Sequence, residues 1–303
     1  MSIHHRTDEV HIPVLLEETV GYLDPVPGET MLDGTLGAGG HAEAILKRIM
    51  PGGRLIGFDR DGDAIERVKA RLKGYGEAVT FVNDDFRNIG DHLGAQHDAC
   101  IDGAVLDLGV SSYHLEEGER GFSFLKDGPL DMRFDKTQRL TARDVVNTSS
   151  THELEEVIRA YGEERHAKLV AKEIIRARGR KKIETTYELV DVVKKAIGSK
   201  YRGQRLHAAA RTFQALRIYV NDELGALERG LDAIMPRLNP GGRIAVISFH
   251  SLEDRIVKNI FRARMREGSF KVLTKKPLTP SREETTANPR SRSAKLRVAE
   301  KVI

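Results

Sequence analysis

The sequence predicts an α/β protein with a doubly wound, mostly parallel sheet and an inserted all-helical segment. Short apolar runs alternate with helix-like stretches along residues 31–107, which is the element order of parallel sheets. Helical periodicity without strand signals then fills residues 115–207, before strand-like runs resume. We therefore expect a sheet domain formed by residues 1–114 and 208–303, and an inserted helical domain of residues 115–207.

The first strand-to-helix connection is the most informative segment. Met31 and Leu32 lead into an acid and a glycine-dense turn, and a helix-like stretch follows. Glycines allow a tight turn and let the backbone approach a ligand that a Cβ would exclude. The same spacing also fits a dinucleotide fingerprint, or a tight turn without a ligand. The candidate cofactor-binding residues of this loop are Asp33, Gly37, Gly39, Gly40 and His41.

Three further strands are predicted, over residues 54–59, 79–83 and 102–107. Each ends in or near an acid, namely Asp59, Asp85 and Asp107. Parallel sheets bind their ligands at the carboxyl ends of the strands. We therefore expect these acids to meet Asp33 at one edge of the sheet.

The remainder of the sheet domain follows the insertion. We expect a helix over residues 213–238, a strand over 243–249 and a helix over 252–266, with Ser251 and Asp254 as a short capping box. The alternating runs 270–273 and 295–302 predict an antiparallel edge. Residues 277–292 are polar and turn-rich, which predicts a long loop.

Composition excludes several classes of protein. The 303 residues are 40% hydrophobic and 31% charged, and no apolar run is long enough to span a membrane. The lone Cys100 excludes a disulfide framework and a thiolate metal site, and the eleven histidines show no ligand spacing. With no apolar leader at the N-terminus, we expect a cytoplasmic protein without a metal.

Positive charge is concentrated in two stretches. Residues 176–205 hold ten Lys/Arg and three acids, and residues 255–303 hold fourteen Lys/Arg and four acids, although the whole chain carries only +4. This uneven pattern favours a polyanionic partner, with an ordinary solvated basic face as the alternative.

The acids indicate which cofactor the loop binds. Asp59 can accept two ribose hydroxyls, and Phe86 after Asp85 can offer adenine an apolar face. Asp33 stands where it can contact a cationic amino-acid group. A negative pocket suits a sulfonium and an ammonium group better than a pyrophosphate. S-adenosylmethionine therefore fits better than a nicotinamide dinucleotide. The alternative, a nicotinamide cofactor, would make the protein a dehydrogenase.

The chain resembles the bacterial small-subunit rRNA cytidine-N4 methyltransferases of the RsmH (MraW) family. Three of the matching segments are Asp33-Gly-Thr-Leu-Gly-Ala-Gly-Gly-His41, Leu106-Asp-Leu-Gly-Val-Ser-Ser112 and Ile247-Ser-Phe-His-Ser-Leu-Glu-Asp-Arg255. The others are residues 11–16, 58–61, 120–123, 129–133, 161–164, 211–218 and 290–297. Together they cover nearly the whole chain in order.

The resemblance implies a class I methyltransferase fold with an inserted helical domain. It also implies methylation of N4 of a decoding-region cytidine in the 16S rRNA of the small ribosomal subunit. By motif, the cofactor contacts are Gly39, Gly40, His41, Asp59, Phe86 and Asp107. The family usually has a Gln after the two serines, where this chain has Tyr113-His114. We expect His114 to take over that cofactor contact.

Three residues are catalytic candidates. Asp107, at the end of its strand, can accept a hydrogen bond from the reacting amine and take up its developing charge. Ser248 and His250 follow the last parallel strand and are expected at the same edge, with His250 accepting or relaying a proton. Phe249 between them can stack on an extruded base. Alternatively, His250 only caps the next helix.

RNA contacts are expected from the two basic stretches and Phe249. The predicted RNA-binding cations are Arg176, Arg178, Arg180, Lys181, Lys182, Lys200, Arg202, Arg205, Arg290, Arg292 and Arg297. An RNA-binding assembly factor with an inert cofactor pocket is the alternative outside enzymes. The sequence leaves the oligomeric state open, with a homodimer among the states it allows.

Overall fold

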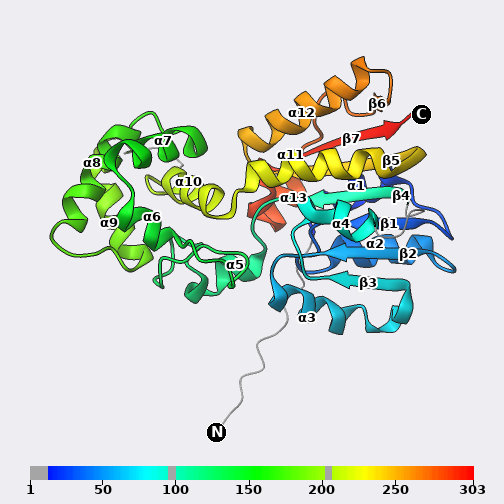
Figure 1. Cartoon of the computed structure of the whole chain (residues 1–303), viewed down its shortest axis with the longest axis horizontal. Coiled ribbons are helices and arrows are strands. Elements are labelled where there is room, and N and C mark those ends of the chain that lie inside the picture. Colours follow the sequence, from blue (N-terminus) through cyan, green and yellow to red (C-terminus); the bar gives the residue numbers. More distant parts are fainter. Residues whose placement is uncertain (1–12, 95–99, 202–206) are drawn as a thin grey trace, which may run out of the picture. The chain divides into compact units, whose positions relative to one another are not determined.

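A computed structural model describes residues 13–94, 100–201 and 207–303 (Figure 1). The chain forms two compact units, one of residues 1–109 with 227–303 and one of residues 110–226. The expected insertion, residues 115–207, lies inside the second unit. That unit also includes α10 (Ala210–Asn221), because α10 packs against α7 (Thr151–Gly162).

Within the described residues, the first unit holds a seven-stranded sheet in the order β3-β2-β1-β4-β5-β7-β6. The strands are β1 (Thr30–Asp33), β2 (Arg54–Phe58), β3 (Val79–Val82), β4 (Ile101–Asp107), β5 (Leu238–Ser248), β6 (Phe270–Val272) and β7 (Lys295–Lys301). The first five are parallel, and β7 pairs antiparallel with both β5 and β6. The parallel sheet and its antiparallel edge are thus confirmed. Strand order reverses between β1 and β4, where α/β sheets bind their ligands.

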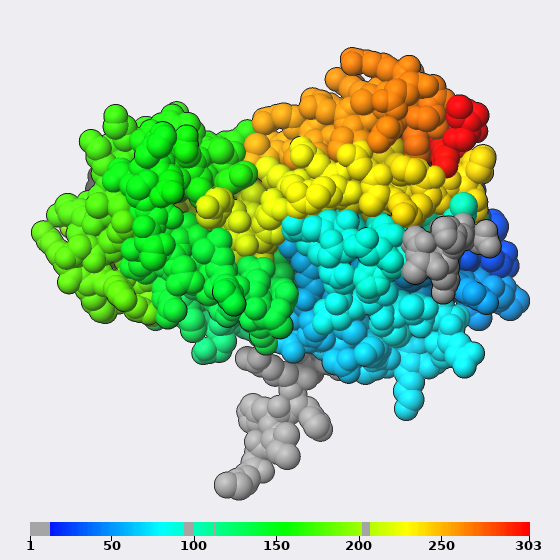
Figure 2. All heavy atoms as spheres, viewed as in Figure 1, coloured from blue at the N-terminus to red at the C-terminus, as the bar shows by residue number. Residues whose placement is uncertain are grey.

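Helices pack on the sheet through apolar stripes. The helices α1 (Leu16–Leu23), α2 (Gly40–Ile49) and α3 (Gly62–Arg71) share one core with the strands. In α2 this stripe is Ala42, Ile45, Leu46 and Ile49, at helical spacing. Figure 1 shows α4 (Ile89–Gly94) and α11 (Glu223–Ile234) in front of the sheet. In Figure 2 the yellow α11–β5 segment forms a band next to the orange α12 (Ser251–Arg266).

The second unit is helical and has its own core. Its helices are α5 (Ser112–Glu116), α6 (Ala142–Thr148), α7, α8 (Ala167–Arg178), α9 (Thr186–Ile197) and α10. Capping boxes with a hydroxyl N-cap start four of them. The pairs are Ser111 with His114, Thr141 with Asp144, Ser150 with Glu153, and Thr185 with Glu188. Local sequence therefore fixes where these helices begin.

Two predicted elements were wrong in part. The helix expected over residues 213–238 is divided into α10 and α11, because Asp222 takes a left-handed conformation (φ 48°) at the end of α10. The loop expected over residues 277–292 contains α13 (Arg282–Ala287), which Ser281 caps by accepting the Glu284 N–H at 3.1 Å. In the described part of the chain, no helix is long and apolar enough to cross a membrane.

Candidate active site

Four carboxylates meet at the carboxyl edge of the parallel strands, as the sequence predicts. Asp33 and Asp107 are the last residues of the paired strands β1 and β4. Asp59 directly follows β2, and Asp85 follows β3. The strand order β3-β2-β1-β4 places the ends of these four strands side by side.

The glycine-rich loop between β1 and α2 is held by the carboxylate of Asp59. Gly37 and Gly39 have φ angles of 52° and 77°, and Gly39 is the residue that precedes α2. The Gly37 N–H donates to Asp59 Oδ2 at 2.8 Å, and the Asp61 N–H donates to Asp59 Oδ1 at 2.9 Å. A carboxylate accepts about four hydrogen bonds, so Asp59 can shape the loop and also accept ribose hydroxyls.

Asp33 is a buried acid whose negative charge is poorly stabilised by its surroundings. Its side chain accepts the Thr35 N–H at 3.0 Å through Oδ1, while Oδ2 has no hydrogen-bond partner among the described residues. Burial raises the pKa of Asp33 to about 7, the Thr35 hydrogen bond opposes this rise, and the charge of Asp59 adds to it. A cationic ligand group would relieve both the burial penalty and the repulsion.

Asp107 has the same character at the neighbouring strand end. Its N–H donates to the Thr35 hydroxyl at 2.6 Å, and its Oδ2 lies 3.6 Å from His41 Nδ1. Its Oδ1 is buried and has no hydrogen-bond partner in the described part of the chain. Burial raises the pKa of Asp107 well above its usual range, and the charges of Asp33 and then Glu253 add to this rise.

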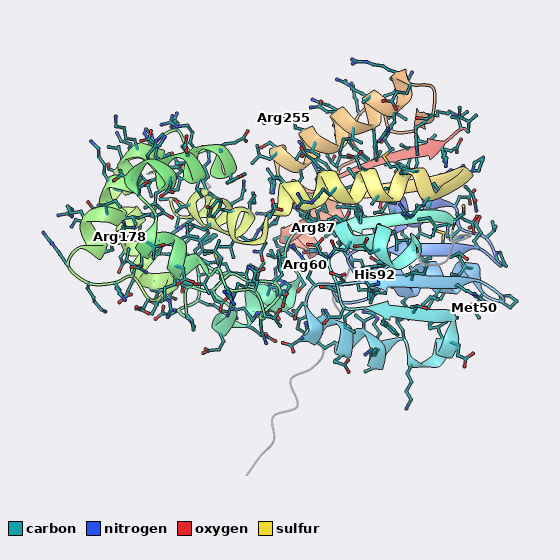
Figure 3. The ribbon with its side chains drawn as sticks, in the orientation of Figure 1. Met50, Arg60, Arg87, His92, Arg178 and Arg255 are labelled. Carbon is teal, nitrogen blue, oxygen red and sulfur yellow. The ribbon has the colours of Figure 1, made fainter. Side chains whose placement is uncertain are left out.

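Asp85 organises the end of β3 with two arginines. Arg60 Nη1 and Arg87 Nε lie 3.1 Å and 2.8 Å from Asp85 Oδ2, and Figure 3 labels both arginines near the ends of β2 and β3. The Phe86 side chain is 7% exposed. A Cβ added to Gly230 of α11 would meet the Phe86 ring at 2.3 Å. Phe86 therefore packs against α11, and an adenine contact stays a prediction.

The turn after β5 carries Ser248, Phe249 and His250. Ser248 Oγ donates to the Lys295 carbonyl at 3.4 Å. His250 is the N-cap of α12, and its Nδ1 accepts the Glu253 N–H at 3.3 Å. The predicted capping pair Ser251–Asp254 was therefore wrong, because the box is formed one residue earlier by His250 and Glu253.

Phe249 lies close to the loop that follows Asp107. Gly109 has a φ of 98°, and a Cβ added there would touch the Phe249 ring at 3.5 Å. The ring therefore lies beside Gly109, two residues after Asp107.

His114 belongs to the second unit and is buried there. Its ring centroid lies 5.0 Å from that of Phe122 and 5.1 Å from that of Phe134. Its Nδ1 accepts the Ser111 N–H at 3.2 Å, which closes the capping box of α5. Its predicted cofactor contact stays a prediction.

The predicted RNA-binding residues differ in their surroundings. Arg176 pairs with Glu173, Lys181 pairs with Glu188, and Arg178 donates to the Val146 carbonyl at 2.8 Å. Figure 3 labels Arg178 at the end of α8.

Other predicted RNA-binding cations are exposed. For Arg180 and Lys182, no side-chain contact of this kind is seen among the described residues. Arg290, Arg292 and Lys200 are also exposed, whereas Arg297 is buried against Asp254. Arg202 and Arg205 lie outside the described residues.

Sequence reasoning missed two residues at this edge. Thr35 was not singled out, although its hydroxyl joins the glycine loop to Asp107. Glu253 was also missed, although it is 2% exposed and contacts the turn after β5. The pattern His250-x-x-Glu253 at a helix start is the signal that could have found Glu253, since it has the spacing of a capping box.

The carboxyl groups at this edge suit a positively charged cofactor. Asp33 Oδ2 and Asp107 Oδ1 are buried carboxyl oxygens that no described residue satisfies. S-adenosylmethionine carries a sulfonium and an ammonium group, which would supply the missing positive charge, while Asp59 would hold the ribose. The open parallel sheet, the glycine loop and these acids together define a class I S-adenosylmethionine-dependent methyltransferase.

Comparison with known proteins identifies the family. Residues 8–302 match the MraW methylase family, and the chain belongs to it. It is similar to proteins named ribosomal RNA small subunit methyltransferase H. The Pelobacter propionicus protein is 50% identical over 308 residues (96% of this chain, 98% of that protein), and the Geobacter sp. strain M21 protein is 51% identical over 307 residues with the same coverage.

A crystal structure of an rRNA methylase from Streptococcus thermophilus is less similar to this chain than those two proteins are in sequence. It is 11% identical with a TM-score of 0.47, covering 97% of this chain and 100% of that one.

Family membership decides between the two cofactor predictions. The chain is a methyltransferase with S-adenosylmethionine as its cofactor, and the dehydrogenase alternative falls away.

Proposed function

We propose that the protein methylates the N4 exocyclic amine of a decoding-region cytidine in 16S rRNA, within the small ribosomal subunit. Relatives of about half identical sequence are named for methylation of small-subunit rRNA. The observation that carries the N4 assignment is the Asp107 carboxyl, which is half-buried at the cofactor edge and has an unsatisfied Oδ1. Such a substrate implies a cytoplasmic enzyme.

The chemistry requires an acceptor for a proton. The N4 lone pair of cytosine is delocalised into the ring, so the amine is a poor nucleophile. When bound, S-adenosylmethionine supplies a methyl group activated by its sulfonium. A carboxylate that accepts a hydrogen bond from the amine N–H stabilises the positive charge that develops on nitrogen. The raised pKa of Asp107 makes it a stronger acceptor than an ordinary surface carboxylate.

Contacts favour Asp107 over the other two catalytic candidates. His250 Nδ1 accepts a backbone N–H, so the proton of the neutral ring is on Nε2, which lies 3.2 Å from Glu253 Oε1 without a hydrogen bond among the described residues. Neither nitrogen of His250 is then available to accept a proton from the amine. Ser248 is engaged with the Lys295 carbonyl. We assign the proton acceptor to Asp107 and the stacking contact with the flipped base to Phe249.

We assign RNA backbone contacts to the outer face of α8. This exposed surface, the α8 basic face, consists of Lys168, Lys172 and Arg176 of α8, with Arg165 just before the helix and Arg180 just after it. The opposite side of α8 is buried in the unit core through Val170 and Ile174. Cations spaced four residues apart are about 6 Å apart along a helix, which suits contact with successive phosphates.

The experiment that tests this function is a methyl-transfer assay with labelled S-adenosylmethionine. Small subunits from cells that lack this enzyme serve as acceptor, and subunits from cells that contain it serve as the already methylated control. Mass analysis of the modified nucleoside should identify N4-methylcytidine. A different methylated nucleoside would contradict the assignment to N4.

Loss of transfer despite cofactor binding would instead favour the inert assembly factor. Replacing Asp107 with Ala separates the two readings in cells. An assembly role should survive this substitution, because it does not require a proton acceptor, whereas methylation should be lost.

A further inference from the structure

Glu253 is a buried carboxylate that the proposed reaction does not use. It occupies the third position of α12 and is 2% exposed. Its Oε2 accepts the Phe249 N–H at 2.8 Å and the His250 N–H at 3.3 Å. Its Oε1 lies 3.2 Å from His250 Nε2. The carboxylate therefore accepts hydrogen bonds from the two consecutive peptide groups on either side of the Phe249 Cα.

Glu253 makes one more backbone hydrogen bond than the acid of an ordinary capping box, and it is buried. Glu153 of α7 occupies the equivalent position and accepts the N-cap N–H of Ser150 at 2.6 Å, but it is exposed to solvent. Glu253 accepts an additional N–H from the residue before the N-cap. That residue is Phe249, whose ring packs beside Gly109. Glu253 consequently fixes the aromatic residue assigned to the substrate base.

Glu253 also acts electrostatically on Asp107. Asp107 pairs in register with Ile247 near the end of β5, and Glu253 accepts the N–H of Phe249 two residues further along that strand's turn. Among the described residues, the acids whose charges act on Asp107 are Asp33 from β1 and Glu253 from α12, and His41 from α2 lies close to it. His41 lies 3.6 Å away and can oppose the two acids only when it is protonated. The negative charge of Glu253 therefore makes ionisation of Asp107 less favourable.

We propose that Glu253 is a positioning residue of the methyl-transfer site, which fixes the Phe249 turn through backbone hydrogen bonds and places a negative charge beside Asp107. This inference rests on the proposed function of Asp107 as proton acceptor. The two roles of Glu253 can then be tested separately, because they depend on different properties of its carboxylate. The hydrogen bonds need only an oxygen acceptor, whereas the effect on Asp107 needs the charge.

The test compares Glu253→Gln with Glu153→Gln as a matched control. Glutamine keeps a carbonyl oxygen for the Phe249 and His250 N–H groups but removes the charge. In a kcat–pH profile, the acid limb should shift to lower pH by about one unit in Glu253→Gln, because Asp107 loses a repelling neighbour. Glu153→Gln should leave the profile unchanged. Glu253→Ala should in addition raise the KM for the small subunit about tenfold, since the Phe249 turn loses its acceptor.

A Glu253→Gln profile that superimposes on the wild type would overturn the proposal and leave Glu253 as a structural cap. If Glu253→Gln does not fold, carboxyl NMR titration of the wild type and Asp107→Asn replaces it. Coupling is reciprocal, so the Glu253 midpoint should fall in Asp107→Asn, and an unchanged midpoint would overturn the proposal. Failure of the proposed function is distinct, because the wild type itself would then produce no N4-methylcytidine.

Discussion

The backbone N–H of Gly37 donates a hydrogen bond to Asp59 Oδ2 at 2.8 Å. This bond joins the glycine loop after β1 to the acid after β2, although 22 positions separate them in the chain. Gly37 has a φ of 52°, so the loop conformation depends on a residue that adopts the left-handed region without strain. Asp59 thus holds the loop in place and contributes its carboxylate to the cofactor edge.

Replacing Asp59 with Ala should weaken S-adenosylmethionine binding about 30-fold or more. The loop loses an acceptor for a charge-assisted hydrogen bond, and the ribose loses the carboxylate that we propose binds it. Isothermal titration calorimetry measures this change. Asp63→Ala, in the exposed first turn of α3, is the control and should bind the cofactor as the wild type does. Equal affinity of the two variants would contradict the role of Asp59.

Asp33 should make stability depend on pH with a defined sign. Its pKa is about 7 in the folded protein against 3.8 for the unperturbed group, so the folded state binds more protons between these values. The free energy of unfolding should therefore fall as pH rises from about 4 to about 7, by up to about 4 kcal/mol from this residue. Asp33→Asn lacks this contribution.

Urea unfolding at pH 4.5, 6 and 7.5 measures the effect. The stability of Asp33→Asn relative to the wild type should increase with pH across this window. Asp63→Asn provides the control at an exposed site. Parallel pH curves for the wild type and Asp33→Asn would show that Asp33 titrates normally.

Gly34 should not tolerate a side chain. A Cβ at this position would lie 2.3 Å from Leu106 Cδ2 and 3.3 Å from Phe86 Cβ. Gly34→Ala should lower the free energy of unfolding by about 1–3 kcal/mol, because the core must move to accept it. Gly74→Ala meets nothing within 4 Å and should be close to neutral. In a double-mutant cycle with Leu106→Ala, the two losses should be less than additive. Full additivity would locate the strain elsewhere.

Neutralising the α8 basic face should weaken RNA binding in a salt-dependent way. The variant Lys168→Ala/Lys172→Ala/Arg180→Ala removes three exposed cations, and its slope of log K against log salt should fall by about 2. The control variant Lys47→Ala/Arg48→Ala/Lys73→Ala removes an equal number of exposed cations from the first unit. Binding to small subunits from 50 to 200 mM salt measures both slopes. Equal slopes would remove α8 from the RNA interface while leaving the catalytic proposal intact.

The sheet was predictable because its signals are local. Each of the strands β1 to β4 is a short apolar run that ends in or near an acid, so the topology of parallel sheets brings those acids together. Helix starts in the second unit were similarly encoded, since a hydroxyl residue stands three positions before an acid at Thr141, Ser150 and Thr185.

The remaining features depend on contacts between distant residues. Thr35 reaches Asp107 across 72 positions, and no local pattern indicates that bond. The break at Asp222 rests on a left-handed backbone that asparagine or glycine would have signalled more clearly than aspartate. The alternative that His250 caps the helix after β5 is confirmed, whereas the Ser251–Asp254 box was placed one residue too late, because serine is a favoured N-cap and histidine an uncommon one.

The most direct test of the central claim compares single-turnover methyl transfer by the wild type and by Asp107→Asn, with cofactor and small subunits saturating. Asparagine keeps the size of the side chain but cannot accept a proton at its amide nitrogen. The wild type should form N4-methylcytidine, and Asp107→Asn should transfer methyl at a rate lower by about 10²–10⁴. If Asp107→Asn retains a rate within a few-fold of the wild type, Asp107 is not the proton acceptor.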